Sequence, residues 1–313
     1  MPTPAVPTAG IDFATKLRAW LQLMRVPNLF TVPGDPLAGV CIAVACGAGV
    51  QSRSVVCVVL SSLLLYIAGL LSNDYFDLEV DRRERPARPL PSGAVRPPAA
   101  LAASVMLGAI GVAAAFCGGR QAGAVAVALA GAIAFYNVGG KRIPVWGPLN
   151  MGLCRGLSLA MGAAGARPAT GGMAVGIAAV GLMTYIAGVT AIAALETESV
   201  PLGPRRWLPC VAVGLMFAGF YALAAPRRGA SALGVSASVA LAIFAFYWAW
   251  RCGRRLAGAQ AAIPPVIGAL VRGLLAMQAS LAALVVPQGL AAAGLLMLLW
   301  PFSAWLGRRF YAS

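Results

Sequence analysis

Histidine is absent from this chain of 313 residues. Its absence excludes acid–base catalysis by imidazole, metal sites built on imidazole and haem ligation by histidine. The seven cysteines lie singly in or beside apolar runs, and none forms a Cys-x-x-Cys pair. We therefore interpret them as small apolar side chains, not as metal ligands or disulfides.

Charge is scarce as well, and acidic charge is the scarcest. Charged residues make up 11% of the chain, with nine acids against 24 lysines and arginines, whereas hydrophobic residues make up 60%. The mean hydropathy of +0.82 excludes a soluble domain of this size and predicts an all-α polytopic membrane protein. Ten apolar runs are candidate membrane spans, at about 29–50, 54–72, 98–118, 121–138, 147–166, 172–195, 206–225, 231–250, 264–284 and 287–306.

These runs leave no room for a soluble domain between them. Residues 1–11 are rich in proline, alanine and threonine and are predicted to be disordered. Residues 12–313 are predicted to form a single membrane-embedded domain, which begins with a short amphipathic helix over 12–25 that lies in the membrane interface and continues into the first span.

The basic residues predict the orientation in the membrane. Fifteen lysines and arginines fall before the first span and in alternate connections, and five fall in the connections of the opposite side. The positive-inside rule then puts the N-terminus and the aspartate-rich loops in the cytoplasm, at the inner membrane if the source is bacterial. Because the charge is spread over separate loops, we expect no nucleic-acid partner.

One stretch gathers most of the acids. Residues 73–81 read NDYFDLEVD, and residues 82–93 read RRERPARPLPSG. Five of the nine acidic residues lie here, directly after the apolar run 54–72. A cluster of carboxylates therefore lies where a membrane helix meets water.

Helical spacing would bring these carboxylates together. At about 100° per residue, Asn73, Asp74, Asp77 and Asp81 fall within an arc of about 100° on one helix. Carboxylates on one face repel one another, and Mg²⁺, which takes one or two carboxylates plus phosphate oxygens, relieves that repulsion. The pattern predicts a Mg²⁺ site; the alternative is an interfacial cluster in which aspartates pair with arginines and fix the topology.

The motif NDxxDxxxD followed by RPxRPLPSG resembles the first aspartate-rich motif of the UbiA superfamily of intramembrane prenyltransferases. The resemblance implies a UbiA-like bundle of nine transmembrane helices with an aspartate-rich cap on the cytoplasmic face, and the ten apolar runs add a tenth helix. It implies that Asp74, Asp77 and Asp81 are catalytic and hold Mg²⁺. It also implies that Asn73 and Arg88 contact the diphosphate of the substrate.

A second part of the resemblance lies after the fourth run. Tyr136-x4-Lys141-Arg142, followed by a helix start that contains Asn150, resembles the family's middle motif, whose lysine contacts the diphosphate. This implies that Lys141 is catalytic, because it would neutralise the charge on a departing diphosphate, and that Tyr136 and Asn150 bind substrate. The alternative is that the two basic residues belong only to the positive-inside pattern.

Three further polar residues lie inside or beside the spans. Asn28 and Asp35 belong to the first span, and Arg155 lies inside the fifth. A buried carboxylate is costly in a membrane, so Asp35 either lines a cavity or caps a helix that restarts after Pro33. Arg155 needs an acidic or phosphate partner, either an aspartate of the 73–81 motif or Asp35. All three are predicted to bind substrate.

The last acids, Glu196 and Glu198, follow the sixth apolar run. In the family a second motif, usually DxxxD-like, sits here, and the resemblance implies that these glutamates bind metal. The sequence departs from that pattern, because residues two apart on a helix diverge by about 160°, so both serve only if the helix unwinds. Together with Leu23-Met24-Arg25-Val26-Pro27-Asn28, this segment resembles the Ebo-type branch of the superfamily.

The resulting hypothesis is a Mg²⁺-dependent prenyltransferase. It would move a prenyl group from a polyprenyl diphosphate to an aromatic or other lipophilic acceptor within the bilayer. A non-catalytic carrier of lipids or metabolites on the same scaffold is the alternative, and a carrier would release no pyrophosphate. A cation transporter would place its acids in the middle of spans, and only Asp35 fits that pattern.

Overall fold

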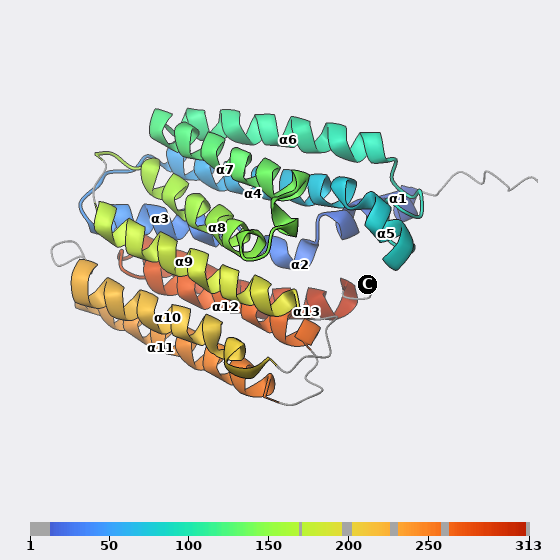
Figure 1. The fold of residues 1–313 in the computed structure, drawn as a ribbon. Helices are drawn as coiled ribbons and strands as arrows, with labels where there is room; N and C mark the ends of the chain where they lie inside the picture. The colour runs from blue at the N-terminus through green and yellow to red at the C-terminus, as the bar shows by residue number, and fades with distance from the viewer. Residues whose placement is uncertain (1–12, 169–170, 196–201, 226–230, 258–262, 311–313) are drawn as a thin grey trace, which may run out of the picture.

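The computed structural model describes residues 13–168, 171–195, 202–225, 231–257 and 263–310 (Figure 1). The segment 1–11, predicted to be disordered, and Glu196 and Glu198 lie outside these described residues. Within them the chain is helical, with one isolated backbone bridge between Gly49 and Arg167. This confirms the all-α class.

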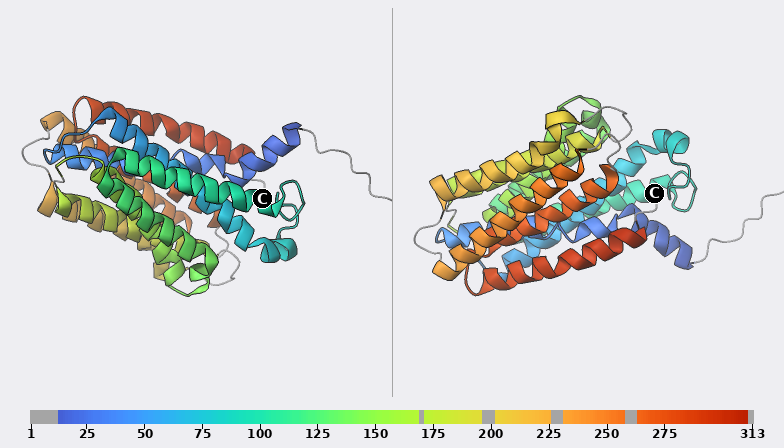
Figure 2. Two further views of the ribbon diagram at one scale, coloured as in Figure 1. Left: turned by 90° about the horizontal axis from the view of Figure 1, so that it is seen from above. Right: turned by 90° about the horizontal axis from the view of Figure 1, so that it is seen from below.

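The α-helices are α1 Phe13–Leu23, α2 Val26–Leu29, α3 Gly34–Ala45, α4 Ser52–Phe76, α5 Leu78–Glu84, α6 Pro97–Gly118, α7 Arg120–Val138, α8 Trp146–Ala164, α9 Gly172–Ala193, α10 Leu208–Gly219, α11 Ala232–Arg255, α12 Ile263–Ala282 and α13 Gln288–Phe310. Three short helices of other types join them: 3-10 helices at Gly140–Arg142 and Gly203–Trp207, and a π-helix at Phe220–Ala224. The long helices run side by side as one bundle, and α1 and α5 project from one end (Figures 1 and 2).

Nine helical segments of the described chain are long and apolar enough to span a membrane, starting with Val26–Ala45 and ending with Gln288–Gly307. Helix α8 is not among them, since it carries Asn150, Arg155 and Ser158. It nevertheless crosses the bundle: Lys141, just before it, meets Asp77 at the end of α4, and Arg167, just after it, pairs with Gly49 near the start of α4. The protein is therefore an integral multi-pass membrane protein, and in its described residues ten helical segments run across the bundle.

The first crossing is not the continuous helix that the sequence predicts. Arg25 adopts the left-handed conformation (φ 46°), which ends α1, and Pro27 stands in the first turn of the four-residue α2. A second break precedes Gly34, where α3 begins. Because of the first break, the Arg25 side chain points toward α4, where it pairs with Asp74.

Close helix contacts at glycines hold α8 in the middle of the bundle. A Cβ added at Gly162 would collide with the carbonyl oxygen of Pro36 on α3, and one at Gly39 with that of Leu159. On another face of α8, Gly152 and Gly156 abut the backbone of α9, as the GxxxG spacing predicts. Backbones thus touch directly, so the polar face of α8 lies deep between its neighbours.

We predict that Gly162→Ala destabilises the protein, by about 1–3 kcal/mol, because the added methyl meets a backbone carbonyl that has no room to move. The matched control is Gly131→Ala on α7, where an added Cβ meets nothing within 4 Å, and its effect should stay within about 0.5 kcal/mol. Unfolding midpoints in detergent compare the two variants. Equal midpoints would contradict the close contact of α3 with α8.

Candidate active site

The aspartate-rich motif lies at the end of a helix and not along one. Helix α4 ends at Phe76, Asp77 has φ −93° and ψ 0°, and α5 starts at Leu78. Asn73 and Asp74 therefore belong to α4, whereas Asp81 belongs to α5, which turns away at the end of the bundle (Figure 1). The structure therefore divides the motif between two helices that meet at Asp77, where the spacing predicts one continuous helix.

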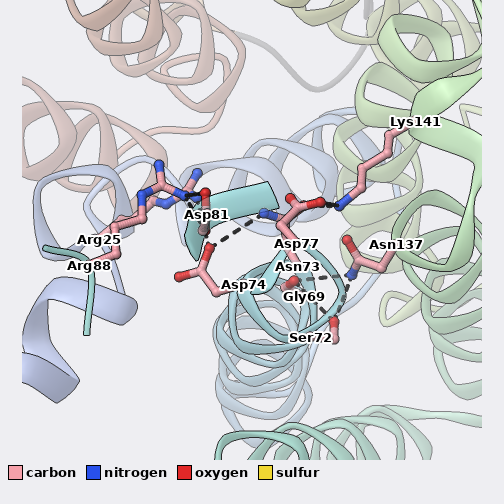
Figure 3. Close-up of polar contacts among 10 residues, drawn as sticks. All are labelled: Arg25, Gly69, Ser72, Asn73, Asp74, Asp77, Asp81, Arg88, Asn137 and Lys141. Carbon is pink, nitrogen blue, oxygen red and sulfur yellow. Dashed lines mark hydrogen bonds and ion pairs between the residues drawn. The ribbon is translucent and has the colours of Figure 1, made fainter. Parts of the chain in front are cut away.

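Each of the three aspartates is paired with a cation from a different segment (Figure 3). The pairs are Asp74 Oδ1 with Arg25 Nη2 at 3.2 Å, Asp77 Oδ1 with Lys141 Nζ at 2.6 Å and Asp81 Oδ2 with Arg88 Nη1 at 2.8 Å. Asp74 and Asp81 are buried. Each carboxylate is thus neutralised by its own cation, and two of the three pairs are the aspartate–arginine pairs that the interfacial-cluster alternative anticipated.

Amide side chains connect the motif to α7 and α8. Lys141 Nζ also donates to Asn73 Oδ1 at 3.1 Å, so Lys141 joins Asn73 to Asp77. Asn137 donates to Gly69 O at 3.1 Å and to Ser72 Oγ at 2.6 Å, which ties α7 to α4. Its own Oδ1 is buried without a hydrogen-bond partner in the described chain, so it is available to accept from a ligand or water.

A cavity of about 160 Å³ opens beside this cluster. Its walls come from α3, α4, α7 and α8, with Arg25 at the α1–α2 break. Arg25, Asn73 and Tyr136 line it at the motif end, and Asp35 and Arg155 line it at the other. Most of the rest of the lining is apolar, so the cavity has polar groups at both ends and an apolar wall between them.

Arg155 pairs with Asp35, the second of the two partners that the sequence allowed. Its Nε lies 2.9 Å from Asp35 Oδ2, and its Nη2 donates to the carbonyl oxygen of Thr31 at 2.9 Å. Gln278 of α12 donates to Asp35 Oδ1 at 2.6 Å and to the same Thr31 carbonyl at 2.8 Å. Asp35 is fully buried and stands in the first turn of α3, so it both begins that helix and faces the cavity.

The remaining predicted site residues separate into two groups. Tyr136 lines the cavity, and Asn28 lies beside the Tyr66 hydroxyl, which also lines it. Asn150 is outside the cavity lining, because its amide donates to the carbonyl of Ala132 on α7 at 2.8 Å and so joins two helices.

Sequence reasoning missed three residues of the site as such. Arg25 was not predicted as a site residue, although the Pro two residues after it signals a break that frees its side chain. Gln278 and Tyr66 are isolated polar residues in apolar runs, and that isolation was the available signal.

The mouth of the cavity fits a hard divalent cation shared with a substrate. Among the described residues no three His, Cys, Asp or Glu side chains converge, so there is no cage made by protein alone. Asp74 and Asp77 each use Oδ1 for their ion pair, which leaves Oδ2 as a further oxygen. One or two carboxylates plus phosphate oxygens is the ligand set that Mg²⁺ prefers, and the donor set here matches it.

The fold and the site together define an intramembrane protein in which aspartates and a lysine lie beside one end of a largely apolar cavity. The sequence profile of the UbiA prenyltransferase family matches residues 36–263, and the chain belongs to this family. A curated relative, the digeranylgeranylglyceryl phosphate synthase of Methanothrix thermoacetophila, is 30% identical over 181 residues. That match covers 58% of this chain and only 62% of the relative's length.

Solved structures show the same fold. A UbiA homologue from Archaeoglobus fulgidus aligns with a TM-score of 0.61 at 16% identity, over 88% of this chain and 99% of the other. A structure of a UbiA homologue from the same organism, bound to DMAPP and Mg²⁺, aligns with a TM-score of 0.51 at 14% identity, over 91% of this chain and 97% of the other. At these identities the likeness concerns the fold alone.

We predict that Arg88→Gln destabilises the cap formed by residues 77–96, by about 2 kcal/mol, because it leaves the buried Asp81 without its cation. The matched control is Glu79→Gln, which breaks the exposed pairs of Glu79 with Arg82 and Arg83 and should cost less than about 0.5 kcal/mol. Limited proteolysis of the 82–93 loop and unfolding midpoints measure both. A larger effect of the Glu79 change would contradict this account.

Proposed function

We propose that this protein is a Mg²⁺-dependent intramembrane prenyltransferase that moves a prenyl group from a polyprenyl diphosphate to a lipophilic acceptor. One observation carries the proposal: Asn73, which lines a largely apolar cavity, is hydrogen-bonded to Asp74 and Lys141, and Lys141 is paired with Asp77. The curated relatives named as synthases support it, and so does the homologue bound to DMAPP and Mg²⁺.

In this proposal the chain's residues bind and orient the diphosphate. Asp74 and Asp77 would hold Mg²⁺, which supplies positive charge to the diphosphate oxygens. Lys141 and Arg25, released from their aspartates, donate to the same oxygens, and Asn73 positions Lys141. The C–O bond of the allylic carbon breaks with its electron pair on the diphosphate, and the acceptor bonds to that carbon and loses a proton to water.

Other predicted residues have supporting parts. Tyr136 would contact the substrate from α7, Arg88 and Asp81 would hold the cap in place, and Asn150 would fix α8 against α7. Asp81 remains a predicted metal ligand, and so do Glu196 and Glu198. We also propose that the mouth of the cavity faces the cytoplasm, because fifteen basic residues fall on that side of the predicted topology and five on the other.

The direct test is a transfer assay on the purified protein in lipid nanodiscs, with a panel of prenyl diphosphates and acceptors and detection of products by mass. We expect a prenylated product together with pyrophosphate. Mg²⁺-dependent diphosphate binding without pyrophosphate release, across the whole panel, would favour the carrier instead.

We predict that Asp77→Asn lowers both diphosphate affinity and turnover, by at least tenfold each, because it removes a metal ligand and the partner of Lys141. Binding of a prenyl thiodiphosphate, measured with Mg²⁺ and with EDTA, should require the metal in the native protein. The matched control is Glu79→Gln, an exposed carboxylate two residues away, which should bind as the native protein does. Equal binding in EDTA would overturn the metal site.

A further inference from the structure

The two ends of the cavity differ in chemistry. Asn73 at the mouth and Ser62 in the interior both lie on α4, eleven residues and therefore about three helical turns apart. The interior end is lined by Ser62, Ser158, Asp35 and Arg155. The bond between Ser62 Oγ and Ser158 Oγ uses only one of the two hydroxyl protons, and an isoprenoid chain, which makes no hydrogen bonds, would leave the other without a ligand to donate to. The interior end therefore suits a polar head group.

We propose that this interior end binds the head group of the acceptor, and that this acceptor is uncharged: an alcohol, phenol or quinol, not a carboxylate or phosphate. The inference rests on the proposed prenyl transfer and names the substrate class of the same site. Its basis is the state of Arg155, the cation at that end of the described cavity lining.

The positive charge of Arg155 is already balanced by Asp35. Asp35 lies 2.9 Å from Nε, and Thr31 accepts from Nη2 through its carbonyl oxygen at 2.9 Å and its hydroxyl at 3.3 Å. An anionic acceptor would have to draw Arg155 away from a carboxylate with no exposure to solvent. An unpaired charge inside a membrane bundle is strongly unfavourable, so the pair resists this exchange.

Besides Arg155, Gln278 also holds the Asp35 side chain in place. Gln278 donates to its Oδ1 at 2.6 Å and, through the same nitrogen, to the Thr31 carbonyl at 2.8 Å. Asp35, Arg155, Thr31 and Gln278 therefore form a closed neutral network, contributed by α3, α8, α12 and the turn before α3. The network presents no net charge to the cavity.

Neutral hydrogen-bonding groups stand beside it. Ser62 Oγ and Ser158 Oγ lie 2.7 Å apart across α4 and α8, and each hydroxyl can both donate and accept. Tyr66 lines the same cavity. These groups match a hydroxyl-bearing acceptor, whereas the curated relative's name refers to a glyceryl phosphate, whose charge would find no free cation at this end.

The test measures acceptor binding directly, by equilibrium dialysis of the protein in nanodiscs with Mg²⁺ and an unreactive prenyl thiodiphosphate. The probes are two matched pairs: 4-hydroxybenzyl alcohol with 4-hydroxybenzoate, and an alkylglycerol with its phosphate. We expect the neutral member of at least one pair to bind at least tenfold more tightly than the charged one. Equal or tighter binding of the charged member in both pairs overturns the proposal, and so does the absence of saturable binding by either neutral compound.

Two variants then test whether the Asp35–Arg155 pair causes the preference for neutral acceptors. Asp35→Asn frees Arg155 and should tighten binding of the charged probes at least tenfold, whereas the double variant Asp35→Asn/Arg155→Gln, neutral again, should not. An unchanged preference in folded Asp35→Asn overturns the assignment, and if that variant fails to fold, the wild-type ratio still decides. Failure of the thiodiphosphate itself to bind refutes prenyl transfer, a result separate from the acceptor ratio.

Discussion

Carboxylates at the edge of a membrane bundle have to be neutralised, and this requirement organises the active end of the molecule. Asp74, Asp77 and Asp81 are paired with Arg25, Lys141 and Arg88, which come from the break after α1, the turn before α8 and the cap loop. The first two pairs join segments that are far apart in the chain, whereas Asp81 and Arg88 are seven residues apart and hold the cap together. The proposed metal and diphosphate would replace these partners without a large change in local charge.

The same constraint acts inside the bundle, with a different outcome. Asp35 and Arg155 satisfy each other, and Gln278 completes the network, so this pair has no charge to offer a ligand. It can sit there because glycines on α8 let that helix lie directly against α3 and α9. At one end of the cavity the ion pairs can be replaced by contacts with a charged ligand. At the other end the Asp35–Arg155 pair stays intact.

The apolar runs made the fold predictable, and the aspartate-rich motif indicated the candidate site, since long hydrophobic stretches and clustered acids at a span end are local features of sequence. The bend at Asp77 was not predictable from spacing alone, because the periodicity of 73–81 is compatible with a continuous helix. The partner of Arg155 required knowledge of which helices touch: Asp35 is 120 residues away in the chain, and Gln278 is 243 residues from Asp35. Arg25 was likewise hidden, since its role depends on a left-handed backbone conformation.

The central claim is that Lys141 leaves Asp77 for the diphosphate when substrate binds. The chain has two lysines, Lys16 and Lys141, so reductive ¹³C-methylation gives a simple NMR spectrum in which Lys141 can be assigned by substitution. The account predicts that Mg²⁺ with a prenyl thiodiphosphate shifts the Lys141 resonance and leaves that of Lys16 in place. A Lys141 resonance that stays unchanged at saturating ligand would contradict it.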